Sequence, residues 1–333
     1  MRVLQEHIVK ETRIAPALVL RLKLMSGLDI SEKRLPQDGR FSLRINDRNI
    51  DVRMSTMPTQ HGESAVMRLL DQTGGVRNMD QLGMPDAMRA RVEALVQRPH
   101  GMFLVTGPTG SGKTTTLYAA LQLLNTPENK IITVEDPVEY RVPRLNQIQV
   151  HAEIGRTFGR VLRSALRHDP DIILIGEMRD EETAEIAIRA AMTGHMVLST
   201  LHTNDALSTV NRLLDMGIKT YLLASALHAI VAQRLVRRIC LSCIQPSQPD
   251  PRETAWLQVF RGVHLDMSAF RKGAGCAHCN HVGYTGRIGV YELLEFHRDL
   301  TEVLARGDSA EFFRAARQAE GFESLERVAL RYA

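Results

Sequence analysis

The sequence predicts an α/β protein built on a parallel sheet, with a small α+β unit before it and a four-cysteine module in its second half. Three observations support this fold class. From about residue 101 onward, short apolar segments alternate with helical segments, as they do in parallel sheets. A glycine-rich phosphate-loop motif follows the first apolar segment. All four cysteines fall in two Cys-x-x-Cys pairs.

Residues 1–97 are expected to form the α+β unit. Apolar residues recur at helical spacing over 18–25, and Gly27 offers a C-terminal stop for that helix. Apolar and polar residues then alternate over 40–55, interrupted by the polar turn 46–49, which predicts a β-hairpin. Because successive side chains of a strand alternate, the hairpin should have one apolar face and one face that carries arginines.

Residues 98–239 are expected to form the parallel-sheet core. Its four predicted strands are 102–106, 131–134, 172–175 and 196–201. Asp180, before the last of these strands, and Asp205, after it, are suited to be helix N-caps. Residues 240–285 form the cysteine module, which contains a proline-rich insert, and residues 286–333 are expected to be helical.

Residues 107–114 read Gly-Pro-Thr-Gly-Ser-Gly-Lys-Thr and match the pattern G-x-x-x-x-G-K-[ST] at every fixed position. A strand that leads into such a loop before a helix directs backbone N–H groups toward phosphate oxygens. Lys113 should reach the β- and γ-phosphates of a nucleotide and Thr114 should ligate Mg²⁺; a glycine-rich surface loop is the alternative. The expected nucleotide-binding residues are Gly107, Pro108, Thr109, Gly110, Ser111, Gly112, Lys113, Thr114 and Thr115.

Acidic residues follow two of the predicted strands. A generic phosphate-loop NTPase has Asp at the end of a later strand, but here Gly176 takes that place and only Glu177 remains to polarise water. A second acidic group is therefore needed. Glu135, Asp136 and Glu139 follow an earlier strand, at the same carboxyl edge of the sheet. The alternative is that these three are solvated loop acids.

Two histidines and five arginines complete the candidate site. His195 and His202 flank the predicted strand 196–201, and we expect both at the phosphate-facing edge, where they could sense the γ-phosphate; structural histidines are the alternative. Hydrolysis also needs a cation against the charge that develops on the transferred phosphoryl group. The candidates are Arg40, Arg53 and Arg68 in the first unit, and Arg163 and Arg167, which are four apart and should share one face of a helix.

The candidate metal ligands are Cys240, Cys243, Cys276 and Cys279. Two Cys-x-x-Cys turns joined by a long insert suit tetrahedral Zn²⁺. Redox pairs and nucleic-acid-binding ribbon turns are the alternatives, and His278 or His281 could substitute for a cysteine.

The composition favours a cytosolic globular protein. The formal net charge is +4, from 42 basic and 38 acidic residues, and 5% of residues are aromatic, which disfavours a protein that coats nucleic acid. The longest apolar stretch, 221–232, is shorter than the ~20 residues of a membrane span, and the N-terminus shows no signal-peptide core. In a reducing compartment, paired cysteines favour metal binding over disulfides.

These motifs resemble those of the type II and type IV secretion ATPase superfamily, the hexameric motors of protein secretion and pilus assembly. The resemblance runs from about residue 14 to 296. In the first unit it lies in Leu-Pro-Gln-Asp-Gly-Arg at 35–40 and in the segments 51–58 and 61–68. In the second unit the segments resemble the family's Walker A motif (107–114), Asp box (132–139), atypical Walker B motif (171–180) and His box (194–202). Because the Walker B motif of this family lacks the generic Asp, the resemblance makes Gly176 an expected feature.

The resemblance implies a RecA-like domain and a PAS-like α+β domain that shift against each other as ATP is bound and hydrolysed in a six-membered ring. The residues that would act on phosphate, Mg²⁺ and water are Lys113, Thr114, Glu177 and Glu139. His195 and His202 would couple the nucleotide state to the fold, and the five arginines would complete the site. The cysteines match the zinc module of the secretion and pilus-extension motors, which the retraction motors lack.

The amino-acid sequence at 35–40, 82–84 and 99–101 is more similar to the type II (GspE-like) branch, which implies pseudopilus assembly for protein secretion. Extension of a type IV pilus (PilB-like) is the alternative, and a RecA-type nucleic-acid translocase or a nucleotide-gated scaffold would be competing functions of other classes. The implied partners are five further copies of the chain and inner-membrane platform proteins (GspL-like and GspF-like), through which alone the cytoplasmic ring would contact the membrane.

The sequence departs from the family pattern in three places. Met178 replaces the usual Ile, and His168 replaces the usual Gln. Family members usually begin with a further N-terminal docking domain, whereas this sequence starts in the arginine-bearing unit. A truncated chain or a different mode of recruitment is therefore expected.

Overall fold

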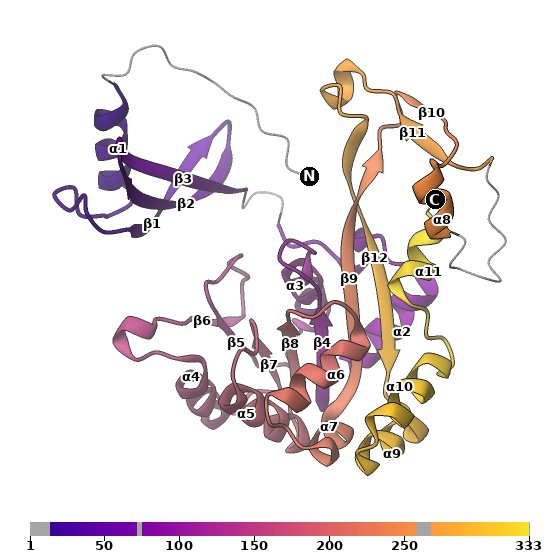
Figure 1. Ribbon diagram of the computed structural model, residues 1–333. Coiled ribbons are helices and arrows are strands. Elements are labelled where there is room, and N and C mark those ends of the chain that lie inside the picture. The colour runs from indigo at the N-terminus through magenta and orange to yellow at the C-terminus, as the bar shows by residue number, and fades with distance from the viewer. Residues whose placement is uncertain (1–13, 72–74, 258–267, 333) are drawn as a thin grey trace. The chain divides into compact units, whose positions relative to one another are not determined.

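The computed structural model describes residues 14–71, 75–257 and 268–332. Residues 1–13 of the expected first unit and 258–267 of the expected cysteine insert lie outside this described part. The chain divides into two compact units, Met1–Gly75 and Val76–Ala333 (Figure 1). No helix among the described residues has both the length and the apolar character that crossing a bilayer requires.

The boundary between the units differs from the one expected at residue 97. Helix α2 (Asp86–Val96) belongs to the second unit, because Val92 and Leu95 are buried in the same apolar cluster as Phe103 of the large sheet. The helix hides its apolar face against that sheet, and the division therefore falls before it.

The first unit is a three-stranded antiparallel sheet with one helix against it. The predicted hairpin is confirmed: Asn46 and Asp47 form its turn with φ of 48° and 62°, the positive values that a two-residue hairpin turn favours. Ser26, just after the helix, donates from its hydroxyl to Met54 Sδ on the sheet (3.3 Å). The elements are α1 (Ile14–Met25), β1 (Gln37–Ile45), β2 (Arg48–Thr59) and β3 (Gly62–Asp71), with the sheet order β1-β2-β3.

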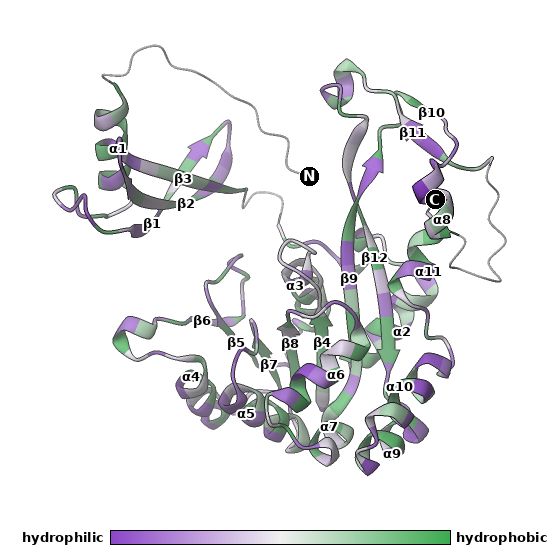
Figure 2. Ribbon diagram, viewed as in Figure 1, coloured by the Kyte–Doolittle hydropathy of each residue, from purple (hydrophilic) through white to green (hydrophobic). Residues whose placement is uncertain are grey.

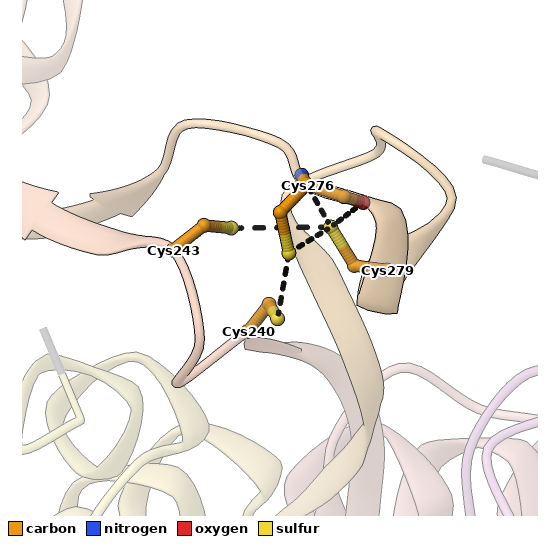
Figure 3. A group of neighbouring side chains, drawn as sticks. All are labelled: Cys240, Cys243, Cys276 and Cys279. Carbon is orange, nitrogen blue, oxygen red and sulfur yellow. Dashed lines mark hydrogen bonds between the residues drawn. The ribbon is translucent and has the colours of Figure 1, made fainter.

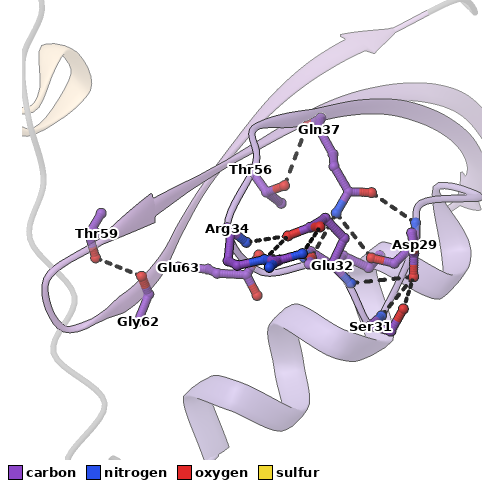
Figure 4. A network of polar contacts seen from close by, with 10 residues as sticks. Asp29, Ser31, Glu32, Arg34, Gln37, Thr56, Thr59, Gly62 and Glu63 are labelled. Carbon is purple, nitrogen blue, oxygen red and sulfur yellow. Dashed lines mark hydrogen bonds and ion pairs between the residues drawn. The ribbon is translucent and has the colours of Figure 1, made fainter.

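A polar network holds the loop between α1 and β1 (Figure 4). Asp29 accepts hydrogen bonds from the Ser31 N–H (2.8 Å) and hydroxyl (2.6 Å), while the Gln37 amide contacts both the N–H and the C=O of Asp29. Lys23, which is 1% exposed, donates to the Glu32 C=O (2.7 Å) and pairs with Glu63 of β3. Because a buried ammonium is costly without such partners, these contacts fix the helix to the loop and the sheet.

The second unit contains a seven-stranded sheet in the order β12-β9-β4-β8-β7-β5-β6, parallel except for β12. The four predicted strands are confirmed as β4 (Gly101–Thr106), β5 (Ile131–Glu135), β7 (Ile172–Ile175) and β8 (Met196–Leu201). The remaining strands of the sheet are β6 (Asn146–Gln149), β9 (Leu227–Ile239) and β12 (Tyr284–Glu295).

Helices cover both faces of this sheet, so its central strands are buried along their whole length and are mostly hydrophobic (Figure 2). Within β4, Met102 and Leu104 join one buried cluster, whereas Phe103 and Val105 join the other. The helices are α3 (Lys113–Leu124), α4 (Phe158–Ala165), α5 (Glu181–Met192), α6 (Ala206–Asp215), α7 (Thr220–Ala226), α8 (Pro251–Leu257), α9 (Arg298–Arg306), α10 (Ser309–Gln318) and α11 (Leu325–Leu330).

The prediction that residues 286–333 are helical is wrong for the segment that β12 occupies, because β12 continues through Glu295. Strand β9 pairs with β4 only up to Ala232 and then continues with β12 as a two-stranded ribbon toward the cysteines (Figure 1). Glu292 of β12, which is 2% exposed, accepts from the first N–H groups of α6 (Ala206, 2.7 Å) and α11 (Leu325, 2.9 Å). β12 is thus tied, where it still belongs to the large sheet, to two helices that flank it.

At the amino end of β9, the His228 ring packs against Gly101, where an added Cβ would lie 2.2 Å from the ring. Burial, with Arg98 and His100 nearby, lowers the pKa of His228 to about 4. The folded state therefore favours neutral His228, and its contribution to stability is complete above pH 6.5 and is lost as the pH falls toward 4. We expect this loss to be on the order of 2 kcal/mol, after allowing for partial exposure.

The measurement is urea unfolding at pH 7 and pH 4.5 for the native chain and for His228→Gln. The variant should lose less stability between the two pH values than the native chain. An identical pH dependence in both proteins would contradict the assignment.

Candidate active site and metal centre

The predicted phosphate loop lies between the buried strand β4 and α3, at the carboxyl edge of the sheet. Gly107, Gly110 and Gly112 have φ of 148°, 81° and 91°, values that side chains rarely permit. At Gly107 an added Cβ would also lie 2.5 Å from the C=O of Gln233 on β9. The glycines of the motif therefore allow the loop to turn tightly against the neighbouring strand.

Lys113 begins α3 and is 8% exposed. Its ammonium folds back over the loop and donates to the C=O groups of Gly107 (2.7 Å) and Pro108 (3.3 Å). Burial lowers the pKa of Lys113, and Glu177 opposes this shift. Thr114 and Thr115 follow in the first turn of α3, beside the same loop.

A chain of polar contacts links three of the predicted motifs. Lys113 Nζ lies 3.4 Å from His202 Nδ1, and His202 Nε2 lies 3.4 Å from Glu177 Oε2. The other oxygen of Glu177 pairs with Arg179, whose Nη1 is 3.9 Å from Asp136 Oδ2. Burial and the charge of Lys113 lower the pKa of His202, while Glu177 opposes them. Arg179 and His202 thus orient the Glu177 carboxylate from two sides, at the edge of the sheet where the phosphate loop lies.

Gly176, in the place of the generic Asp, is explained by packing. Its N–H donates to the Val134 C=O (2.8 Å), and an added Cβ would lie 3.3 Å from the Glu135 Cα. β7 therefore approaches the backbone of β5 too closely for a larger residue to enter without displacement. The acidic residue at the end of this strand is Glu177, one residue further on.

The three acids of the Asp box have different surroundings. Glu135 is 3% exposed and accepts from the hydroxyls of Tyr118 and Thr133, both at 2.6 Å. Burial raises the pKa of Glu135, and these hydrogen bonds oppose the rise. Asp136 is exposed and faces Arg179, whereas Glu139 is half-buried and close enough to add to the rise at Glu135. Glu135 is therefore a structural group that ties α3 to β5.

The prediction that both histidines lie at the phosphate-facing edge is wrong for His195. β8 runs parallel to β4 with Met196 opposite Gly101 and Leu201 opposite Thr106. His195 therefore lies at the amino edge, where its C=O accepts from the Gly101 N–H (3.1 Å). The six residues of β8, at ~3.3 Å each, place it about 20 Å from His202.

Arg163 and Arg167 do not share one helix. α4 ends at Ala165, and Arg167 lies in the following 3-10 turn, η3 (Leu166–His168). Arg163 pairs with Glu182 of α5 (2.5 Å), and the Arg167 guanidinium donates to the Arg163 C=O (2.9 Å). Neither residue has a recorded contact with the phosphate loop or with Glu177 among the described residues.

Arg40, Arg53 and Arg68 form one row across the sheet of the first unit. Arg40 is directly opposite Arg53 on β1 and β2, and Arg53 is directly opposite Arg68 on β2 and β3. The buried carboxylate of Asp51 pairs with Arg40 (2.7 Å) on the same face. Three neighbouring arginines with one carboxylate among them leave this face with an excess of positive charge, which attracts anions.

Sequence reasoning missed two residues of β9 that support the site. Gln233 is 1% exposed; its amide donates to the Ser111 C=O (2.7 Å) and accepts from the Thr116 hydroxyl (2.8 Å). Arg234, the next residue, donates to the Asn204 C=O (2.6 Å) in the loop after His202. No local motif marks them, because their role depends on the pairing of β9 with β4.

We expect Gln233→Ala to weaken nucleotide binding about tenfold, because the loss of the amide removes a buried partner from the Ser111 C=O in the loop and from the Thr116 hydroxyl in α3, each at a cost of about 1–3 kcal/mol. Titration with a fluorescent nucleotide measures the affinity. Gln122→Ala, at an exposed position of α3, is the matched control and should bind normally. Equal affinity in both variants would contradict the bracing role of Gln233.

The four cysteines converge at the end of the β9–β12 ribbon (Figure 3). All four Sγ atoms lie within 4.8 Å of one another, with separations of 4.0 Å (Cys240 to Cys276), 3.9 Å (Cys243 to Cys279) and 3.7 Å (Cys276 to Cys279). A tetrahedral zinc site with Zn–S of about 2.3 Å requires about 3.8 Å between sulfurs. The cluster therefore fits zinc, and among the described residues neither His278 nor His281 belongs to it.

Backbone N–H groups point at the sulfurs. The Cys276 and Gly283 N–H groups donate to Cys279 Sγ (3.2 and 3.3 Å), and the Gly275 N–H donates to Cys243 Sγ (3.3 Å). The bond from Cys276 is the main cause that lowers the pKa of Cys279 to about 6, whereas burial raises that of Cys243. Such donors stabilise thiolate, the form that binds zinc. The short pairs β10 (Ile244–Pro246) and β11 (Arg271–Gly273) complete the module.

Comparisons with known proteins identify the family. Residues 1–331 match the family model described as "Type II/IV secretion system protein". The chain is 48% identical over 322 residues to the Type II secretion system protein HxcR of Pseudomonas aeruginosa, covering 97% of this chain and 64% of that protein. It is 48% identical over 302 residues to the Type II secretion system ATPase E of Vibrio cholerae, covering 91% and 59%.

Among solved structures, the pilus retraction motor PilT with bound ADP matches with a TM-score of 0.63 and 28% identity, over 89% of this chain and 77% of that one. The chain spans about 60% of the length of the two secretion proteins it matches. Because the family model covers nearly the whole sequence and the relatives are close to half identical, the chain belongs to the type II/IV secretion system protein family.

Proposed function

We propose that the chain hydrolyses ATP as the motor part of a hexameric ring that drives assembly of a pseudopilus for type II protein secretion. The observation that carries this proposal is the contact chain from Lys113 through His202 to Glu177 beside the phosphate loop. It brings an ammonium, an imidazole and a carboxylate together at one edge of the sheet, which supports roles for them in phosphate binding, sensing and the activation of water.

In this proposal Lys113 exchanges its two carbonyl partners for phosphate oxygens, which are stronger acceptors. Thr114, with its hydroxyl in the first helical turn, would hold Mg²⁺, which screens the phosphate charge. Glu177, oriented by Arg179 and His202, would accept a proton from the attacking water, and Glu139 would support the water and metal.

The arginine row of the first unit would supply the remaining positive charge. Arg40, Arg53 and Arg68 lie on one face and would be drawn to the phosphates of bound ATP, from the same chain or from a neighbour. Loss of the γ-phosphate would weaken this attraction and release the unit. His195, Arg163 and Arg167, which are outside the contact chain, are proposed to act at boundaries between subunits.

The ring would be cytoplasmic and would reach the inner membrane only through the platform proteins of the secretion system. Residues 98–239 would form the RecA-like motor and residues 240–285 a zinc module that keeps the ribbon end folded. In the pilus-extension alternative, the ring would bind a pilus platform in place of a secretion platform. In the nucleic-acid translocase alternative, DNA would stimulate ATP hydrolysis.

The test is phosphate release from ATP by the purified full-length protein with Mg²⁺, combined with sedimentation and with capture from membranes. We expect turnover in a six-membered species, no stimulation by single- or double-stranded DNA, and capture of a secretion platform. Absence of turnover or of any ring would refute the motor. Capture of a pilus platform, or stimulation by DNA, would instead support the corresponding alternative.

A further inference from the structure

A cavity of ≈ 960 Å³ lies beside β6 and α4, and its lining is built entirely from the second unit. Its floor contains Ile132, Val161 and Ala165, which are each less than 9% exposed. Ile154, which is 65% exposed, stands at the rim. The hollow is as large as a typical ligand site, and none of the residues described above as contacting the phosphate loop lines it.

The charge of the lining has one sign. Lys130, Arg156, Arg160 and His168 line the cavity, and no Asp or Glu does. Among the described residues, none of these four forms an ion pair. By contrast, Arg163, which lies on α4 with Arg160, pairs with Glu182. The Asp171 carboxylate accepts a hydrogen bond from the backbone N–H of Lys130 (2.7 Å), which leaves the Lys130 ammonium out of that contact.

The basic side chains form two pairs at opposite ends of β6. Lys130 directly precedes β5 and His168 precedes β7, so both lie toward the amino edge of the sheet. Arg156 pairs through its backbone with His151, just after β6, and Arg160 donates to the Gly155 C=O (3.4 Å). The four residues of β6 separate the two ends by about 13 Å.

β6 is also the last strand in the sheet order, so its outer edge pairs with no described strand. An open strand edge offers backbone donors and acceptors to an added strand, and flanking pockets select its side chains. Charged residues beside an edge strand often have the sole role of preventing pairing with other chains. That role does not require a hollow with an apolar floor.

We propose that this cavity binds an extended acidic segment of a partner protein, with apolar side chains between two acidic ends. The segment adds to the edge of β6 by backbone hydrogen bonds. Its apolar side chains cover the floor at Ile132 and Val161, and its carboxylates meet the pairs of basic side chains at the two ends. The charge pattern fixes the position of the segment, and the apolar floor selects its central residues.

The test uses a fluorescent peptide, Glu-Asp-Val-Thr-Val-Asp-Glu, titrated against the full-length protein and followed by anisotropy. A neutral peptide with Gln and Asn in place of the acids is the ligand control. We expect the acidic peptide to bind, the double variant R156E/R160E to bind it at least about tenfold more weakly, and added salt to weaken the native complex.

R314E/R317E, on exposed positions of α10, changes the net charge equally and should bind as the native chain does. Thermal unfolding checks that both variants fold, and hydrogen exchange should show new protection in β6 when the peptide is bound. The proposal is overturned if the acidic peptide shows no binding up to 1 mM, or if both double variants lose binding equally. It is also overturned if inorganic pyrophosphate displaces the peptide at equal concentration, or if R156E/R160E alters only self-association.

Discussion

Lys113→Ala is expected to lower the rate of ATP hydrolysis by about 10²-fold or more, comparable to the loss of a charge-stabilising donor in other active sites. The ammonium is positioned by two carbonyls of the loop, and no other basic side chain has a recorded contact with the loop among the described residues. Phosphate release with Mg²⁺ measures the rate. Lys219→Ala, at an exposed position before α7, is the matched control and should keep the native rate.

The same variant has a second readout that does not depend on turnover. The charge of Lys113 contributes to the lowered pKa of His202, so removal of the ammonium should raise the pKa of His202 toward its ordinary value. NMR titration of the imidazole resonances in the native chain and in Lys113→Ala would detect this shift. An unchanged His202 pKa together with unchanged hydrolysis would show that the contact chain does not operate as described.

Removal of zinc is expected to have the second large effect, on stability. We expect about one zinc per chain in the native protein, and loss of tight metal binding in Cys240→Ser and Cys279→Ser, because a structural site of this kind contributes about 10 kcal/mol or more of binding free energy. The ribbon end, β10 and β11 should then lose their protection from hydrogen exchange. Elemental analysis and exchange measured by mass spectrometry test these two expectations.

Ser242→Ala is the matched control for the metal site, because Ser242 lies in the same turn as two of the cysteines and is exposed. It should retain zinc and the native exchange pattern. A native chain that contains no zinc and keeps the same protection after chelation would contradict the metal centre. The redox alternative would then be tested by the number of free thiols.

Much of the site is encoded locally, and these parts were predicted from the sequence. The loop around Lys113, the four strands and the four cysteines depend on residue types at short spacings, and the structure confirms their arrangement. Glu177 was found because it follows a recognisable strand. A local pattern can be recognised without knowledge of the partners across the sheet.

The predictions that failed concern position across the fold. A histidine at either end of a strand looks equivalent in the sequence, but the parallel register places His195 and His202 at opposite edges. The acids of the Asp box look alike too, yet burial beside Tyr118 makes Glu135 structural. α2 was assigned to the first unit because its apolar face does not reveal which sheet will cover it.

The sequence by itself determined the phosphate loop, the parallel-sheet class and the four-cysteine set, because each depends on residue types at short local spacings. Only the tertiary structure decided that Gln233 braces the loop, that Arg179 and His202 orient Glu177, and that three arginines form one row. Apart from Glu177 and Arg179, which are two residues apart, these contacts join residues that are distant in the chain. Strand register and burial bring them together, and both depend on the free energy of packing the whole unit.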